Sequence, residues 1–260
     1  MQWTNTKEWA HVDLDRETEH KAALVTRDFL LKVKEALQKA DAQQPGTYLT
    51  VPFSRFEKPH LAFLLAAIGT GEVRIIAGET RAEETGIHGL WRIQEKGVNR
   101  FEVTRIPQFA LDNLSDGAFP ECLPDAPQGA FAAPAILKEL QKAQAELNPD
   151  PLKNTPPYTI ELTRQPLGPA DLGYLETTLG VGVLQIGIAG FADASIESTA
   201  VRGIWRSKIF NKAGKALFDA YVAATLPEEV PNDFEELLDG AKQCDEILAW
   251  INADLAEGRL

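Results

Sequence analysis

The sequence has few of the residues that build disulfide-linked or membrane-embedded structures. It contains only two cysteines in 260 residues, Cys122 and Cys244, and two distant thiols do not make a disulfide framework. No stretch approaches the roughly 20 apolar residues that a membrane-spanning helix needs. The polar N-terminus, residues 1–15, lacks the apolar centre of a signal peptide. These absences predict a cytoplasmic chain in a reducing compartment, without a membrane span.

Residue patterns for catalysis and metal binding are also missing. The sequence has neither a Gly-x-Ser-x-Gly elbow nor a Cys–His signature. Its carboxylates are numerous, but no pair stands out as an acid–base couple. The sequence therefore predicts no metal site, no cofactor and no enzymatic activity. The histidines are scattered and have no metal-ligand spacing: His11, His20, His60 and His88.

Positive charge is scarce. Lys and Arg total 26 against 38 Asp and Glu, which gives a net charge of −12. This balance argues against nucleic acid and anionic membranes as partners, because both are bound by clustered Lys and Arg. The negative charge has two interpretations. It is common among soluble cytosolic proteins and then indicates nothing further, or, more specifically, it indicates a basic partner. The hydrophobic fraction of 44% indicates globular domains with proper cores.

What the chain does contain is an internal repeat. Two glycine pairs lie 111 residues apart, and two tryptophans that follow them lie 114 residues apart. A repeat of about 110 residues is too long for a solenoid and has the size of a small domain. The repeated landmarks are Ile68-Gly69-Thr70-Gly71 and Gly89-Leu90-Trp91-Arg92 in the first half, and Leu179-Gly180-Val181-Gly182 and Gly203-Ile204-Trp205-Arg206 in the second.

The repeat and the periodicity together predict an α+β fold with two tandem domains. Each domain is expected in the order β-α-β-β-β-α, with helices on one face of a mainly antiparallel sheet. The predicted parts are an N-terminal extension (1–46) with one added helix (18–40), a first repeat domain (47–148), a Pro-rich linker (149–157) and a second repeat domain (158–260).

The paired glycines do not indicate a nucleotide-binding loop. A dinucleotide fingerprint follows a strand and opens a helix, so that phosphate meets the helix N-terminus. Here residues 69–71 and 180–182 follow a predicted helix and precede a strand. A phosphate would therefore face the negative end of the helix dipole. Helix capping and a tight turn explain the glycines better.

The two tryptophans have two interpretations. Trp91 and Trp205 follow a glycine in a predicted strand, which is typical of a core tryptophan with a small neighbour. Alternatively, each is an exposed aromatic anchor for a partner. Arg92 and Arg206 must point to the opposite sheet face, because side chains alternate along a strand. If the tryptophans are core residues, the arginines are outward and available to a partner.

At this point the residues suggest a family. Several runs resemble, in order and spacing, the conserved C-terminal region of the hydrogenase expression/formation proteins of the HupH/HyaF type, over roughly residues 47–257. One departure is Gly190-Phe191-Ala192, where the family usually carries a Gly-Tyr-Gly type of turn followed by a polar residue or cysteine. The matching runs are 182–190, 198–205, 209–211 and 225–230, with 69–75 and 89–92 as the upstream copy.

The resemblance implies a non-enzymatic accessory protein or chaperone in the maturation of membrane-bound [NiFe] uptake hydrogenases. Its implied partners are the precursor of the iron–sulfur small subunit, before export, and a thioredoxin-like accessory protein. Two alternatives remain open: a small-ligand sensor or enzyme with a pocket between the domains, and self-association through sheet edges. The candidate partner-binding residues are Trp91, Arg92, Phe191, Trp205, Arg206 and Asn211.

Overall fold

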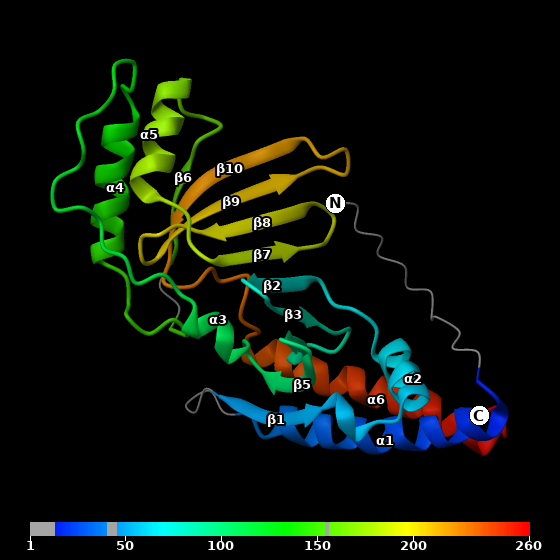
Figure 1. The fold of residues 1–260 in the computed structure, drawn as a ribbon. Coiled ribbons are helices and arrows are strands. Elements are labelled where there is room, and N and C mark those ends of the chain that lie inside the picture. The colour runs from blue at the N-terminus through cyan, green and yellow to red at the C-terminus, as the bar shows by residue number, and fades with distance from the viewer. Residues whose placement is uncertain (1–13, 41–45, 154–155) are drawn as a thin grey trace. The chain divides into compact units, whose positions relative to one another are not determined.

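The computed structural model describes residues 14–40, 46–153 and 156–260. Predictions about the polar N-terminus before residue 14 and about part of the linker lie outside these residues. The predicted α+β class is confirmed by helices and antiparallel strands along the chain (Figure 1). In the described part, no helix is both long and apolar enough to cross a membrane.

The chain divides into two compact units whose boundaries differ from the predicted ones. The first unit comprises the described residues up to Arg74, together with Glu79–Gln108 and Asn232–Leu260. The second comprises Ile75–Gly78 and Phe109–Pro231. The final helix of the chain, expected to close the second repeat, therefore belongs to the first unit. Periodicity predicts a helix and its apolar face, but not the sheet against which that face packs.

The first unit is a sheet in the order β1-β5-β4-β3-β2, with helices packed around a shared core. The strand pairs β1–β5, β4–β5 and β3–β4 are all antiparallel. β2 is divided between the two units. Its elements are α1 (Arg16–Gln38), β1 (Thr47–Pro52), the 3-10 turn η1 (Phe53–Arg55), α2 (Lys58–Ile68), β2 (Val73–Ala77), β3 (Thr80–Glu84), β4 (Leu90–Glu95), β5 (Val98–Thr104) and α6 (Phe234–Ala256).

The second unit is built on a sheet in the order β7-β8-β9-β10-β6, again antiparallel. Its helices α4 and α5 pack together and share a core with β6 and β10 (Figure 1). Its elements are α3 (Gln108–Asp112), α4 (Ala133–Ala145), β6 (Tyr158–Glu161), α5 (Pro169–Leu179), β7 (Leu184–Ile188), β8 (Asp193–Ser198), β9 (Ile204–Phe210) and β10 (Ala216–Ala223). The first residue of α3, Gln108, still belongs to the first unit.

Each repeat contains one strand more than the sequence predicted. The additional strands are β3 and β8, so four consecutive strands follow α2 and four follow α5. Both strands are rich in polar residues, which hides the apolar alternation that identifies a strand. β9 begins at Ile204, directly after Gly203 turns the chain with a φ of +69°.

The helices of the repeat were also assigned wrongly. α1 precedes the first strand of its unit, and α4 precedes β6 in the same way. By order along the chain, α1 and α4 therefore occupy equivalent places. Near Gly89, however, both α6 and α1 approach: a Cβ atom there would meet Leu237 Cδ2 of α6 first and then Leu37 Cδ2 of α1, at 3.0 Å. At Gly203 a Cβ atom would lie 2.5 Å from Leu147 Cδ1, two residues after the end of α4.

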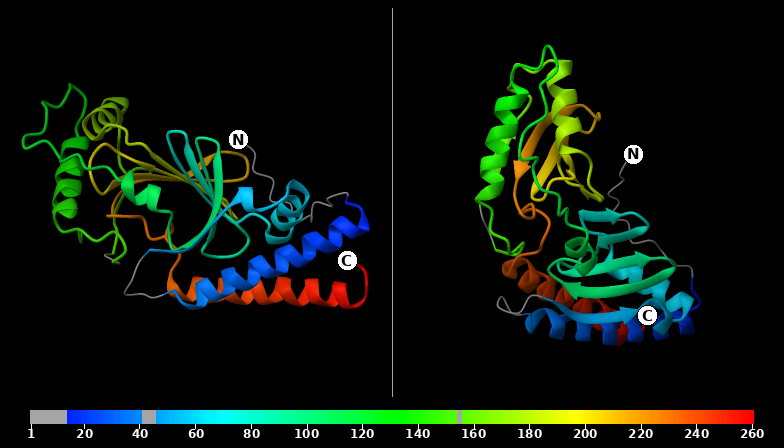
Figure 2. Two further views of the ribbon diagram at one scale, coloured as in Figure 1. Left: turned by 60° about the horizontal axis from the view of Figure 1, so that its bottom comes forward. Right: turned by 60° about the vertical axis from the view of Figure 1, so that its left-hand side comes forward.

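α6 runs antiparallel to α1 in the first unit (Figure 2). Arg16 at the start of α1 donates to the carbonyl of Gly258, 2.6 Å away, and Lys34 pairs with Asp245 at 2.6 Å. Leu237 and Ile251 of α6 are buried in the core that α1 lines. Burial of this apolar seam is the main stabilising contribution of α6.

Candidate partner-binding surface

The two tryptophans are core residues. Trp91 is 0% exposed and Trp205 is 2% exposed. Their indole Nε1 groups donate to the carbonyls of Thr104, at 3.0 Å, and Ala224, at 2.9 Å. These matched bonds satisfy the one polar group of each buried indole. The core interpretation is correct, and neither ring is available to a partner.

Arg206 is also held within its unit, contrary to the expectation that it is outward and free. Its Nε and Nη2 atoms donate to the two carboxylate oxygens of Asp219, both at 3.0 Å. Nη1 donates to Glu176 of α5 at 2.6 Å, and the guanidinium lies 5.5 Å from the ring centre of Tyr221. The Asp219 hydrogen bonds, followed by that of Glu176, raise the pKa of Arg206 despite partial burial. This arrangement fastens α5 to β9 and β10.

Arg92 differs from its counterpart. Its side chain is 43% exposed, and its ion-pair partner is the carboxylate of Glu83, 3.9 Å away. At this distance the pair is loose and largely solvated, so it contributes little to stability. Arg92 is the one of the two arginines that is accessible from solvent.

Phe191 and Asn211 lie in two neighbouring hairpin connections at the same end of the second unit's sheet (Figure 1). Lys212 ties the connections together: its ammonium donates to the Gly190 carbonyl at 2.7 Å and pairs with Asp193 at 3.0 Å. The Asn211 side chain shapes its own turn by accepting from the backbone N–H of Ala213, at 3.0 Å, and of Lys215, at 2.9 Å. Asn211 therefore has a structural task in this turn.

Phe191 is fully exposed, at 101%, and an apolar row crosses the sheet beside it. Ile188 of β7 pairs with Ala194 of β8, which pairs with Ile209 of β9, which pairs with Phe218 of β10. Residues paired across strands share a face, so these four side chains form a continuous row, and each is partly exposed. We use the name hairpin-end surface for Phe191, this row of four side chains and the exposed residue Leu217.

Leu217 is 56% exposed where the pairing of β9 with β10 shifts register between Ala216 and Phe218. Bulges of this kind redirect a side chain at the end of a strand. The β2–β3 and β4–β5 hairpins turn through the short polar pairs Gly78-Glu79 and Lys96-Gly97, and Val98 is the large apolar side chain exposed beside them. An exposed apolar cluster of this type marks an interaction site more often than chance exposure.

The sequence suggested Phe191 and Asn211 as candidates but did not reveal the apolar row. The row depends on cross-strand register, and strand β8 was not predicted. The alternation of Ile186 with Ile188 was the only signal that pointed to it, because alternate apolar residues in a strand share one face.

A buried polar cluster lies under the loop that follows β3. Glu84 is 4% exposed and accepts from the Asn232 side chain at 2.9 Å. The ring of His88 lies 3.7 Å from the Glu84 carboxylate, which raises the pKa of His88. Arg105 donates to the Asn232 carbonyl at 2.8 Å. These contacts fix the loop to Asn232, two residues before the first residue of α6, so the cluster has a structural role.

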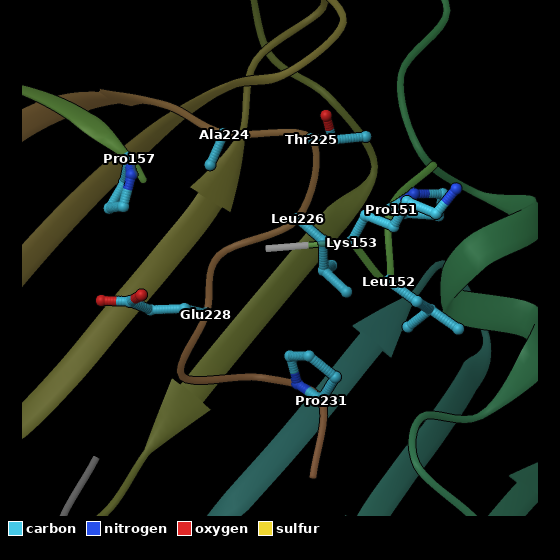
Figure 3. Close-up of a pocket in the computed structure, with 9 residues that line it drawn as sticks. All are labelled: Pro151, Leu152, Lys153, Pro157, Ala224, Thr225, Leu226, Glu228 and Pro231. Atoms are coloured by element: carbon cyan, nitrogen blue, oxygen red, sulfur yellow. The ribbon is translucent and has the colours of Figure 1, made fainter. Parts of the chain in front are cut away.

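Two pockets within the second unit are too small for a metabolite. The pocket in Figure 3 is lined by Pro151, Leu152, Leu226 and Pro231 among others, and has a volume of about 20 Å³. A second, beside Trp205, has about 90 Å³. Typical ligand sites measure roughly 300–1,000 Å³. The first has room for about one water molecule, and the second for a few.

Neither cysteine is placed for chemistry with another group. Cys244 is buried in the first unit, and burial raises the pKa of its thiol to about 12. Cys122 is exposed, and both thiols are free. Among the described residues, no group of three or more His, Cys, Asp or Glu side chains is placed to hold a metal ion.

Comparison with known proteins agrees with the resemblance of the sequence. Residues 130–251 match the C-terminal conserved region of the HupH hydrogenase expression protein. The hydrogenase expression/formation protein HoxQ of Cupriavidus necator is 27% identical over 256 residues, covering 91% of this chain and 86% of its own. The hydrogenase-1 operon protein HyaF of Escherichia coli is 26% identical over 231 residues, covering 82% and 78%.

The hydrogenase expression/formation protein HupH of Rhodobacter capsulatus is 28% identical over 218 residues, covering 82% of this chain and 77% of its own. A solved structure of the hydrogenase expression protein HupH from Thiobacillus denitrificans matches 46% of this chain and 95% of that chain, with 23% identity and a TM-score of 0.38. The match at residues 130–251 and these relatives confirm that the chain resembles the hydrogenase expression/formation proteins of the HupH/HyaF type.

Proposed function

We propose that this protein is an accessory protein of hydrogenase maturation that binds the precursor of the iron–sulfur small subunit of a [NiFe] uptake hydrogenase. The names of its relatives indicate a role in hydrogenase expression or formation. The identity of the client is our inference. In this proposal, the protein acts in the cytoplasm before export, beside a thioredoxin-like accessory protein, and catalyses no reaction.

The observation that carries the proposal is the hairpin-end surface. A fully exposed Phe191 beside an apolar row is costly to leave in water and is well suited to bind a partner. A subunit that has not yet met its final partner exposes apolar surface of its own. Mutual burial would stabilise the complex, and Phe191 would serve as the central anchor.

The structure also offers reasons why this surface is rigid enough to recognise a client. Lys212 fastens one hairpin connection to the other, and Asn211 holds the second turn in shape. A preorganised surface loses less conformational entropy on binding than a mobile one. The contribution of Asn211 to binding is therefore expected to be indirect.

A substitution pair tests the proposal. Phe191→Ser removes the exposed ring, whereas Val98→Ser removes an apolar side chain that is 59% exposed on β5 of the first unit. We expect Phe191→Ser to weaken binding to the purified precursor by about tenfold or more, as measured by biolayer interferometry, because a buried aromatic anchor contributes about 1.5–3 kcal/mol. Val98→Ser is expected to bind like the unmodified protein. Equal affinities of the two variants for the precursor would mean that the hairpin-end surface does not bind it.

A further inference from the structure

Arg92 and Arg206 occupy equivalent positions with different surroundings. Arg206 pairs with Tyr221 across β10, and Arg92 pairs with Phe101 across β5. The carboxylate that holds Arg206 comes from Asp219, two residues before Tyr221 and thus on the same face. Arg92 and Arg206 therefore occupy equivalent positions on the corresponding faces of the two sheets.

The carboxylates that hold Arg206 have no counterparts in the first unit. Two residues before Phe101 stands Asn99, at the place of Asp219. Glu176 stands four residues before the glycine that caps α5, and the residue four before the glycine that caps α2 is Leu65. The first unit thus replaces both acidic partners with uncharged residues.

The consequence is visible in the contacts. Arg206 has a side chain only 14% exposed and makes three hydrogen bonds to carboxylates. Arg92 is 43% exposed, with one carboxylate 3.9 Å away. The Asn99 Oδ1 atom is buried and has no hydrogen-bond donor among the described residues. Arg92 consequently keeps the five donors of its guanidinium largely for solvent or a partner.

Two further arginines lie on the same face of the first sheet. Arg81 and Glu83 alternate with the buried Ala82 along β3, so both point to the face of Arg92. Arg74 of β2 pairs with Glu83 at 2.5 Å, and Arg81 is exposed. Arg74 and Arg92 therefore both face the carboxylate of Glu83, and Arg81 stands two residues from Glu83 on the same face, in a chain of net charge −12. The equivalent residues of the second unit, beside its own Glu197, are the uncharged Gln185 and Ser195.

We infer that Arg92, with Arg74 and Arg81, binds an acidic segment of a partner protein. The partner would supply between chains the carboxylates that Asp219 and Glu176 supply to Arg206 within the second unit. Arginine binds carboxylates with two parallel hydrogen bonds, which favours a carboxylate-bearing peptide as the occupant. Three arginines beside a glutamate are too few to neutralise the run of phosphates along a nucleic acid. This surface lies in the first unit and is distinct from the hairpin-end surface.

The experiment uses the full chain and a hexaglutamate peptide as the probe, with hexaglutamine as its uncharged control. Binding is followed by the NMR signals of the arginine Nε–H groups. We expect hexaglutamate, but not hexaglutamine, to shift the Arg92 signal. Arg92→Gln should weaken binding by about tenfold, because a hydrogen-bonded ion pair is lost. Arg164→Gln, which changes an exposed arginine of the second unit, should leave binding unchanged.

Asn99→Asp provides the sharper variant. This variant places a carboxylate in the first unit at the position that corresponds to Asp219 in the second. Arg92 should then pair with the new carboxylate within the chain, as Arg206 pairs with Asp219. We expect hexaglutamate binding to weaken by about tenfold while the protein stays folded. Hexaglutamate that binds no better than hexaglutamine would overturn the inference. So would an affinity that neither Arg92→Gln nor Asn99→Asp changes, or an equally tight complex with a single-stranded oligonucleotide of the same charge.

Discussion

Asp171 joins two helix N-termini of the second unit through one buried carboxylate. Its Oδ1 atom accepts from the backbone N–H groups of Ala132, at 2.8 Å, and Ala133, at 2.9 Å, where α4 begins. Its Oδ2 atom accepts from Gly168 at 3.1 Å, where α5 begins. The side chain is 2% exposed. Asp171→Ala would therefore leave three backbone donors unpaired at the positive ends of two helix dipoles.

The cost follows from these bonds. A hydrogen bond to a charged group contributes about 1.5–3 kcal/mol, and loss of an N-cap costs about 0.5–2 kcal/mol. Because the three bonds share one carboxylate, their contributions do not add fully. We expect Asp171→Ala to lower the free energy of unfolding by about 4 kcal/mol, a large part of the roughly 5–15 kcal/mol typical of a domain.

The assay is urea unfolding followed by circular dichroism between pH 7 and pH 3. The hydrogen bond from Ala133, then those from Gly168 and Ala132, lower the pKa of Asp171 below its usual value. A carboxyl group with a lowered pKa stabilises the fold above its unfolded pKa of about 3.9 and loses that contribution as the pH falls through the folded pKa. The difference between wild type and Asp171→Ala should be constant above about pH 5 and shrink below about pH 4.

The matched control is Asp125→Ala, which removes an exposed carboxylate in the loop before α4. Its free energy of unfolding should stay within about 0.5 kcal/mol of wild type. The reasoning is refuted if Asp171→Ala unfolds like Asp125→Ala at pH 7. It is also refuted if the deficit of Asp171→Ala is the same at pH 3 as at pH 7.

Three further predictions concern single residues. Gly203→Ala places a Cβ at a φ of +69° and against a packed leucine, so it should lower the free energy of unfolding by about 2 kcal/mol in urea unfolding, and an unchanged midpoint would contradict this. Glu84→Gln removes the carboxylate that raises the pKa of His88, so an NMR titration should show a lower pKa. In wild type the raised pKa stabilises the fold below about pH 6.5, and this contribution disappears as the pH rises through the folded pKa. Native protein should react with one equivalent of thiol reagent, at Cys122, and with two in denaturant, because Cys244 is buried with a pKa of about 12; two equivalents in the native state would contradict its burial.

The sequence revealed the repeat because its landmarks are backbone requirements. Gly69 and Gly180 cap helices with φ values of +64° and +63°, which only glycine adopts easily, so the pattern persists in both halves. The tryptophans persist because each fills a core position and needs one carbonyl partner. Features of this kind can be read from residues along the chain.

Features that depend on contacts between distant segments could not be predicted in the same way. α4 follows the first sheet in the chain but packs on the second, and its periodicity is the same in either place. The locked state of Arg206 depends on Asp219 and on Glu176 from a helix, and no local pattern relates these residues. The exposure of Phe191 can be predicted from the sequence, because an aromatic residue between small ones in a hairpin connection has few neighbours to cover it.

The central claim is that the protein binds an unfinished hydrogenase small subunit. The most direct measurement is size-exclusion chromatography with light scattering of the full chain mixed with the purified small-subunit precursor, and separately with the mature subunit. The account predicts a complex with the precursor but not with the mature form, and loss of that complex in Phe191→Ser. Elution of the precursor and this protein as separate species, with and without the thioredoxin-like accessory protein, would contradict the account.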